Sequence, residues 1–268
     1  MLQSLLRSLV LLALALTAAC TATTPADIEA SGSVEQAVSR QTASSESRKR
    51  AKVHADLGMA YLQEGRYEVA LDEARIALES ESGYAPAHNL KALIYMALRK
   101  NELAEQSFQE ALSQARGDPE INNDYGWFLC QTGRHRQALS HFRVAINNPL
   151  YQSPLKALTN AGLCALAAKD DKLAEEYLLR ALRMDRAHAA AYYWLADIAY
   201  RGGRLADARQ RLKDLHALAS PNAQSAWLAL RVERKLGDRD EEARFMGIMR
   251  RMFRDTEEYA RMMRGEFE

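Results

Sequence analysis

The chain of 268 residues has few helix-breaking residues and almost no net charge. It contains only 6 Pro and 13 Gly, while Ala, Leu, Arg and Glu recur throughout, and these side chains lose little freedom in a helix. No alternating stretch bounded by turn residues indicates a β-strand. The 36 Lys and Arg nearly balance the 35 Asp and Glu, so composition gives no support for a nucleic-acid partner. The sequence therefore predicts an all-α protein.

The chain also lacks the signatures of a catalytic or metal site. It has 3 Cys and 6 His, and no pair of His is spaced one helical turn apart with a Glu between them. His135 and His141 fall in one predicted helix but on different faces. There is no nucleophile elbow and no phosphate-binding Gly loop. We therefore expect no enzymatic activity, cofactor, metal or small-molecule substrate.

The apolar run near the N-terminus, Leu9 to Leu16, is too short to span a bilayer as a helix. Arg7 precedes it, and small residues followed by Cys20 end it, as in a secretory signal. This ending resembles the lipobox of bacterial lipoproteins, which implies a signal peptide over residues 1–19 and lipidation of Cys20. The alternative is an ordinary signal peptide with an incidental Cys.

Residues 20–50 are rich in Ala, Ser, Thr and Gln and poor in large apolar groups. Such a stretch buries too little surface to offset its ordering entropy. We predict a flexible tether between lipid and domain. The alternative for part of it is a short isolated helix around Val34 to Val38.

The rest of the chain repeats with a period of 34 residues, which shows most clearly in small side chains. One aligned series is Gly58, Ala92, Gly126, Gly162, Ala196 and Leu230. A second series is Ala70, Ala104, Ala138, Ala174 and Ala208. A fixed period of this length is typical of repeat proteins in which each unit stacks on its neighbours.

This pattern resembles the tetratricopeptide repeat over Ala51 to about Pro221. The resemblance implies paired antiparallel helices stacked into an α-solenoid, a right-handed superhelix with a concave groove. Five units are clear, and a sixth is degenerate, as terminal repeats often are. We predict a repeat domain over residues 51–254, followed by a capping helix and tail over 255–268.

The first helix of each unit is expected to line the concave groove. Residues one after and three before each aligned small residue should face it, including Trp227 and Arg231 in the sixth unit. Aromatic area contributes affinity, and amides can satisfy a peptide backbone. The alternative is that these side chains only pack between helices. The predicted protein-binding residues are Met59, Asn89, Leu93, Asn123, Trp127 and Tyr193.

Cys130 and Cys164 lie at nearly the same depth in adjacent first helices. Because neighbouring first helices run side by side and a periplasmic location is oxidising, a structural disulfide is one expectation. The other is a pair of buried free thiols.

The whole chain resembles the PilF/PilW pilotin family of type IV pilus biogenesis. The resemblance rests on the segments 122–130 and 161–164 and on the tail from Phe253 to Glu268. It implies an outer-membrane lipoprotein, held by its acyl anchor at the periplasmic face, that binds secretin subunits and promotes their outer-membrane localisation and multimerisation. The alternative is a repeat lipoprotein that serves as scaffold or adaptor for another envelope assembly machine.

Overall fold

The computed structural model describes residues 34–268, which are all-helical and contain no strand. The predicted signal peptide, Cys20 and the first part of the predicted tether lie outside the described residues. The elements are η1, a 3₁₀-helix (Val38–Arg40), α1 (Glu46–Gln63), α2 (Tyr67–Ser80), α3 (Ala85–Ala97), α4 (Asn101–Gln114), α5 (Pro119–Gln131), α6 (His135–Asn147), α7 (Pro154–Ala167), α8 (Asp171–Met184), α9 (Ala189–Arg201), α10 (Leu205–Leu218), α11 (Ala223–Leu236), α12 (Arg239–Met252) and α13 (Glu257–Arg264).

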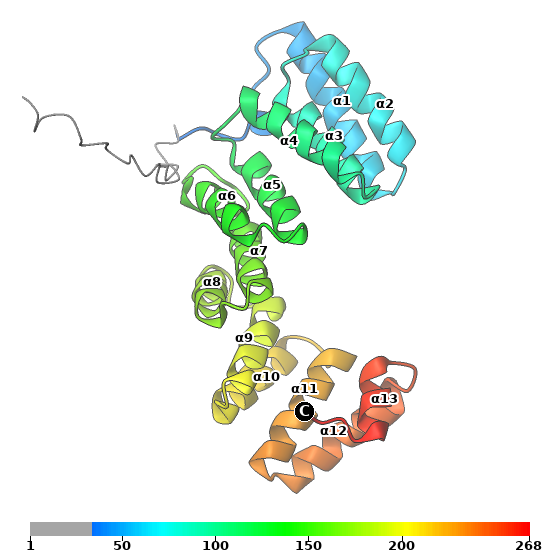
Figure 1. Cartoon of the computed structure of the whole chain (residues 1–268), viewed down its shortest axis with the longest axis vertical. Coiled ribbons are helices and arrows are strands. Elements are labelled where there is room, and N and C mark those ends of the chain that lie inside the picture. The colour runs from blue at the N-terminus through cyan, green and yellow to red at the C-terminus, as the bar shows by residue number, and fades with distance from the viewer. Residues whose placement is uncertain (1–33) are drawn as a thin grey trace, which may run out of the picture. The chain divides into compact units, whose positions relative to one another are not determined.

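The first twelve α-helices form six consecutive hairpins, from α1–α2 to α11–α12 (Figure 1). The second helix of each hairpin also contacts the first helix of the next one. First helices touch directly at α1–α3, α3–α5, α5–α7 and α9–α11. The predicted array of six repeats is confirmed, and the sixth unit is a complete hairpin despite its degenerate sequence.

The aligned small residues sit where the two helices of a hairpin come closest. A Cβ added at Gly126 would lie 2.9 Å from the ring of Phe142 and 3.2 Å from the main-chain oxygen of Ala138. At Gly162 it would lie 2.9 Å from Leu178. These contacts are shorter than packed atoms tolerate, so the third and fourth units require Gly at this register.

The turn inside each hairpin places one residue in the left-handed region. Gly133 has φ 80°, and Gly65, Gly203 and Gly237 lie near the same value. In the second and fourth units Arg99 (φ 58°) and Lys169 (φ 61°) occupy the equivalent place. A left-handed residue ends the first helix and turns the chain into the second.

The structure differs from the predicted tether at residues 34–50. Helix α1 begins at Glu46, after Ser45 caps it by accepting from the Arg48 N–H. Before it, Ala37 is only 2% exposed, and Val38 packs against the buried residues of the first units. The expected boundary at residue 50 therefore lies inside a helix, because a few apolar contacts and hydrogen bonds order this polar segment.

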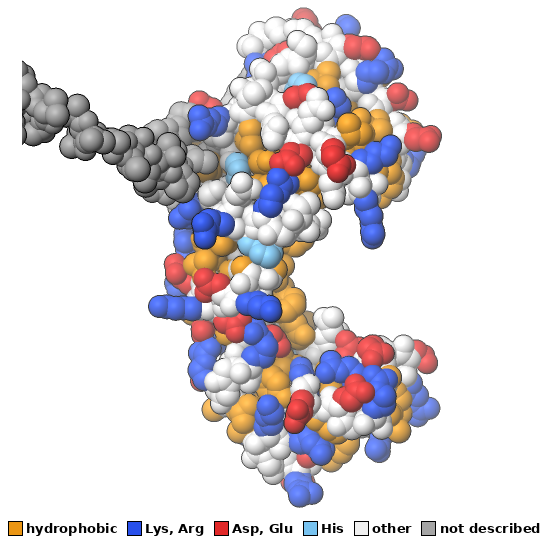
Figure 2. Space-filling model, in the orientation of Figure 1, with side chains coloured by type: hydrophobic (Ala, Val, Ile, Leu, Met, Phe, Trp, Pro, Cys, Tyr) orange, Lys and Arg blue, Asp and Glu red, His pale blue; other side chains and the backbone are white. Residues whose placement is uncertain are grey.

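At the other end, α13 and the tail pack against the sixth unit (Figure 1). Figure 2 shows Lys and Arg interspersed with Asp and Glu over one face, in keeping with the balanced composition. None of the helices in the described part combines the length and hydropathy that a bilayer-spanning segment needs.

Candidate binding site

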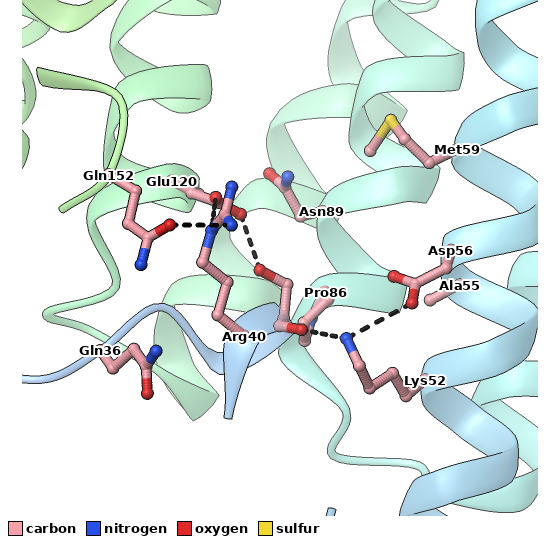
Figure 3. Close-up of a pocket in the computed structure, with 11 residues that line it drawn as sticks. Gln36, Arg40, Lys52, Ala55, Asp56, Met59, Pro86, Asn89, Glu120 and Gln152 are labelled. Carbon is pink, nitrogen blue, oxygen red and sulfur yellow. Dashed lines mark hydrogen bonds and ion pairs between the residues drawn. The ribbon is translucent and has the colours of Figure 1, made fainter. Parts of the chain in front are cut away.

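A pocket of about 550 Å³ opens beside the first helices of the first two units (Figure 3). It contains two predicted groove residues, Met59 on α1 and Asn89 on α3. The other lining residues are Gln36, Ser39, Arg40, Lys52, Ala55, Asp56, Pro86, Glu120 and Gln152. The structure thus brings part of the predicted groove together in one concave site.

The segment before α1 forms one wall of this pocket; we call residues 36–40 the strap. The Val38 N–H donates to Asp118 Oδ2 at 2.7 Å, and the Ser39 hydroxyl donates to Glu120 Oε2 at 2.7 Å. Asp118 also caps α5, since its Oδ1 accepts from the main-chain N–H groups of the first turn. Burial raises the pKa of the Asp118 carboxyl, although these backbone donors oppose the shift.

The charged groups of the pocket are paired with one another. Arg40 lies 3.1 Å from Glu120, and Lys52 lies 3.3 Å from Asp56 (Figure 3). Lys52 also donates to the main-chain oxygen of Ser39. Because each cation has an acidic partner, the pocket presents no strong field of one sign, and a charged small ligand would have to break an existing pair.

Asn89 provides the unsatisfied group of the pocket. Its side-chain nitrogen donates to Asp124 Oδ2 at 3.0 Å, and the residue is only 6% exposed. Its Oδ1 is buried and finds no hydrogen-bond donor among the described residues. A buried acceptor without a partner is costly. This oxygen has no exposed surface, so a main-chain N–H of a bound polypeptide reaches it only if the Asn89 side chain turns toward the pocket, beside the apolar side chain of Met59.

A polar network on the first helices connects the second, third and fourth units. Asp124 accepts from Asn89, from Asn123 at 3.0 Å and from Lys156 at 3.0 Å. Asn123 in turn accepts from the Asn160 amide at 3.0 Å. We call these five residues the amide ladder. It holds Asn89 in one orientation and so fixes where its free oxygen points.

The remaining predicted contact residues lie outside the pocket. Leu93 and Trp127 are partly buried and pack against the same core cluster of the second to fourth units. Tyr193 is also partly buried, with its ring 5.0 Å from Trp194. It packs against the last core cluster, and burial raises its pKa. The six residues therefore do not form one continuous contact set.

Asn123 requires a correction. We expected its amide to contact a partner, but the residue has 0% exposure. Both of its side-chain ends are engaged within the amide ladder. Asn123 therefore positions its neighbours and offers no surface to a ligand in this structure.

Comparison with known proteins assigns the repeats. Two models of the tetratricopeptide repeat match: one at residues 55–119, 89–152 and 172–223, and one at residues 155–188. The chain belongs to the tetratricopeptide repeat family. The matched residues cover part of the first helix and all of the second helix of the first unit, and nearly all of the next four units.

This tetratricopeptide repeat protein is homologous to the PilF/PilW proteins. It is 29% identical over 206 residues to the type IV pilus assembly protein PilF of Pseudomonas aeruginosa, covering 77% of this chain and 82% of that protein. It is similar to a crystal structure of PilW, described as a widely conserved type IV pilus biogenesis factor, with a TM-score of 0.73, 29% identity and coverage of 80% of this chain and 98% of that chain. A structure of Pseudomonas aeruginosa PilF gives a TM-score of 0.75 at 27% identity, covering 82% of this chain and 100% of that one.

In this repeat protein Cys130 and Cys164 are joined in a disulfide, with their Cα atoms 5.7 Å apart. The bond links the first helices of the third and fourth units, α5 and α7. Residues 34–268 contain no cluster of three or more His, Cys, Asp or Glu side chains placed to hold a metal ion.

Sequence reasoning missed the strap and its partners in the pocket, because a polar, Ser-rich stretch gives no signal for a docked segment. The Asp118-Pro119-Glu120 sequence is a recognisable helix start. Nothing in it indicates that the same carboxylate also binds Val38, 80 residues earlier.

Proposed function

We propose that the chain acts in type IV pilus biogenesis as a protein that binds secretin subunits and carries no catalysis of its own. It would help those subunits to reach the outer membrane and to form their multimer. The assignment to the pilus system rests on similarity to PilF and PilW along most of each chain. The observation that supports a polypeptide ligand is the concave pocket on the first helices, which is lined by the apolar side chain of Met59 and the amide of Asn89.

In this proposal the binding face is the row of first helices α1, α3 and α5. Met59 contributes apolar surface, Asn89 contributes an amide that lines the pocket, and Leu93 and Trp127 add partly exposed side chains farther along the row. A secretin segment bound there gains aromatic and apolar contact area. The already paired charges of the pocket disfavour a charged small molecule as the ligand.

We further propose that Cys20 carries the lipid that holds the protein at the periplasmic face of the outer membrane. Each buried methylene of an acyl chain contributes about 0.8 kcal/mol, so several chains hold a protein stably in the membrane. In a strain producing only the Cys20→Ser protein, we expect no incorporation of labelled palmitate into this protein. We also expect release of the protein from the membrane fraction.

The experiment that tests the function is gene deletion followed by re-expression of variants. We expect deletion to abolish piliation and the heat-stable secretin multimer, and the wild-type chain to restore both. Met59→Glu places a charge in the pocket and should fail to restore multimers, because an unpaired charge there opposes an apolar contact. Normal multimers in the deletion strain would instead assign the protein to another envelope assembly.

Val53→Glu is the matched control for the pocket variant. Val53 lies on the same helix, is 62% exposed and does not line the pocket, so this variant should restore multimers fully. Both variants must show the circular dichroism and unfolding temperature of the wild type. Equal multimer levels with two folded variants would remove the pocket from the binding site.

A further inference from the structure

The last residues of the chain fold back onto the first helix of the sixth unit. Gly265, with φ 74°, ends α13 in the left-handed conformation and reverses the chain direction. The Phe267 ring then lies 5.4 Å from the ring of Trp227 on α11. The Tyr200 hydroxyl on α9 donates to the Phe267 main-chain oxygen at 3.3 Å. Figure 1 shows the end of the chain lying over α11.

The surface beneath this tail combines aromatic rings with cations. The Arg231 guanidinium lies 4.7 Å from the Tyr200 ring centroid and 5.5 Å from that of Trp227. The Lys235 ammonium lies 4.4 Å from the Tyr200 ring. Within residues 34–268 neither Arg231 nor Lys235 forms an ion pair. The site therefore keeps surplus positive charge, which favours an acidic ligand.

Two hydrogen-bond donors in this site have no acceptor. Trp227 is only 2% exposed, and neither its Nε1 nor the Arg231 Nε has a partner among the described residues. Such groups are usually satisfied when they are buried. The tail supplies its aromatic ring and one main-chain oxygen, and it leaves these donors free. A ligand with further carbonyl or carboxylate oxygens can accept from them.

The tail itself is held by few contacts. Phe267 is partly buried, and Glu266 and Glu268 are exposed. Arg234 lies 4.0 Å from the Phe267 ring centroid, and Arg261 donates to the main-chain oxygen of Glu268 at 3.2 Å. Exposed ion pairs such as Arg264 with Glu266 contribute little to stability. The segment can thus leave without unpacking a core helix.

We propose that Tyr200, Trp227, Arg231 and Arg234 form a second peptide-binding site, and that the chain's own Gly265–Glu268 segment occupies it in the resting protein. Its ligand class is a peptide segment of a partner that carries an aromatic side chain between acidic residues. The tail shows the chemistry that fits: its Phe ring packs on an indole, and its Glu266 carboxylate pairs with Arg261 and Arg264 beside this site. A partner segment with more acceptors displaces the tail.

The test uses the whole chain and a shortened chain that ends at Gly265, which keeps the cap of α13. The probe is the synthetic peptide Gly-Glu-Phe-Glu, and the readout is the indole N–H signal of Trp227 in nitrogen-15 NMR. The chain has 3 Trp, so Trp227→Phe assigns that signal. We expect shortening to move it and the peptide to return it to its position in the whole chain.

Two comparisons establish specificity. Gly-Glu-Ser-Glu should leave the signal unchanged, and Gly-Lys-Phe-Lys should bind at least about tenfold more weakly because of the cations in the site. The whole chain should also bind Gly-Glu-Phe-Glu at least about tenfold more weakly than the shortened chain, because its tethered tail competes at a high effective concentration.

A shortened, folded chain whose Trp227 signal ignores Gly-Glu-Phe-Glu would overturn the proposal. If shortening unfolds the protein, the full-length Phe267→Ser variant takes its place, since it removes only the ring from the site. Loss of fold in both proteins would show that the tail is part of the core, and would equally refute a displaceable segment. None of these results depends on secretin binding, so the outcome is independent of the proposed function.

Discussion

At the scale of single residues, the left-handed turns give a direct test of the fold. Arg99 carries a side chain where equivalent turns have Gly, and a non-Gly residue there costs about 1–2 kcal/mol. Introducing Gly removes this cost from the folded state. Gly also raises the entropy of the unfolded chain, which offsets part of the gain in stability. We therefore expect Arg99→Gly to raise the free energy of unfolding by about 0.5–1 kcal/mol in urea titrations.

The reverse change provides the matched control for this turn. Gly133→Ala forces a Cβ into φ 80° and should destabilise the protein by about 1 kcal/mol. A destabilising Arg99→Gly together with a neutral Gly133→Ala would contradict the turn geometry.

His141 predicts a specific pH dependence of stability. Burial lowers its pKa from 6.5 to about 4, with its Nδ1–H donating to Asn122 Oδ1 at 2.8 Å and the Tyr125 ring centroid 4.8 Å away. Because the folded-state pKa lies below the unfolded one, this contribution is complete above pH 6.5 and is lost as the pH falls toward 4.

We expect the wild-type protein to lose about 1–2 kcal/mol of unfolding free energy through His141 between pH 7 and pH 5. His141→Gln should lack this component, although it is less stable at pH 7. Parallel pH profiles for His141→Gln and wild type would exclude His141 as the source.

The structural role of a residue could be predicted from sequence where its packing is local and repeats from unit to unit. The small residues at 58, 92 and 126 mark the helix crossings in the sequence. The turn residues Arg99 and Lys169 could not be recognised, since no Gly marks them. The burial of Asn123 was also missed, because its neighbours Asp124 and Asn160 gave no sign that they satisfy it within the protein.

At the scale of helices, the disulfide between α5 and α7 should stabilise the middle of the array. It closes a loop with a sequence separation of 34, for which constraint of the unfolded chain contributes about 2–4 kcal/mol. We expect reductant to lower the free energy of unfolding by that amount, and mass mapping without reductant to recover the Cys130–Cys164 peptide pair.

A Cys130→Ala, Cys164→Ala double variant is the control for the reductant itself. It should have the stability of the reduced protein and show no response to reductant. Two free thiols in protein isolated from an oxidising compartment, or equal stability of oxidised and reduced wild type, would contradict the structural role.

The helices themselves followed from the 34-residue period, whereas the strap and the tail did not. Both segments bind through long-range pairs, Val38 with Asp118 and Phe267 with Trp227. Neither pair leaves a periodic signal in the sequence. The strap and the tail both lie outside the aligned repeats, so the docking of these two segments depends on contacts that only the folded array creates.

At the scale of the whole molecule, the described residues form a repeat array with an open pocket beside its first helices and a proposed site covered by its own tail. The sequence allowed prediction of the array and the row of candidate contact residues. It could not show that only Met59 and Asn89 of that row share a pocket. Tyr193 lies instead with the residues of the last core cluster.

The most direct test of the account is the affinity of the purified protein for a soluble secretin fragment, measured by titration calorimetry. If the first helices bind secretin, Trp127→Ala should weaken binding by about 1–4 kcal/mol. Met184→Ala, at an exposed position at the end of a second helix, should leave the affinity unchanged. Undiminished affinity in folded Trp127→Ala and Met59→Ala proteins would contradict binding through this face.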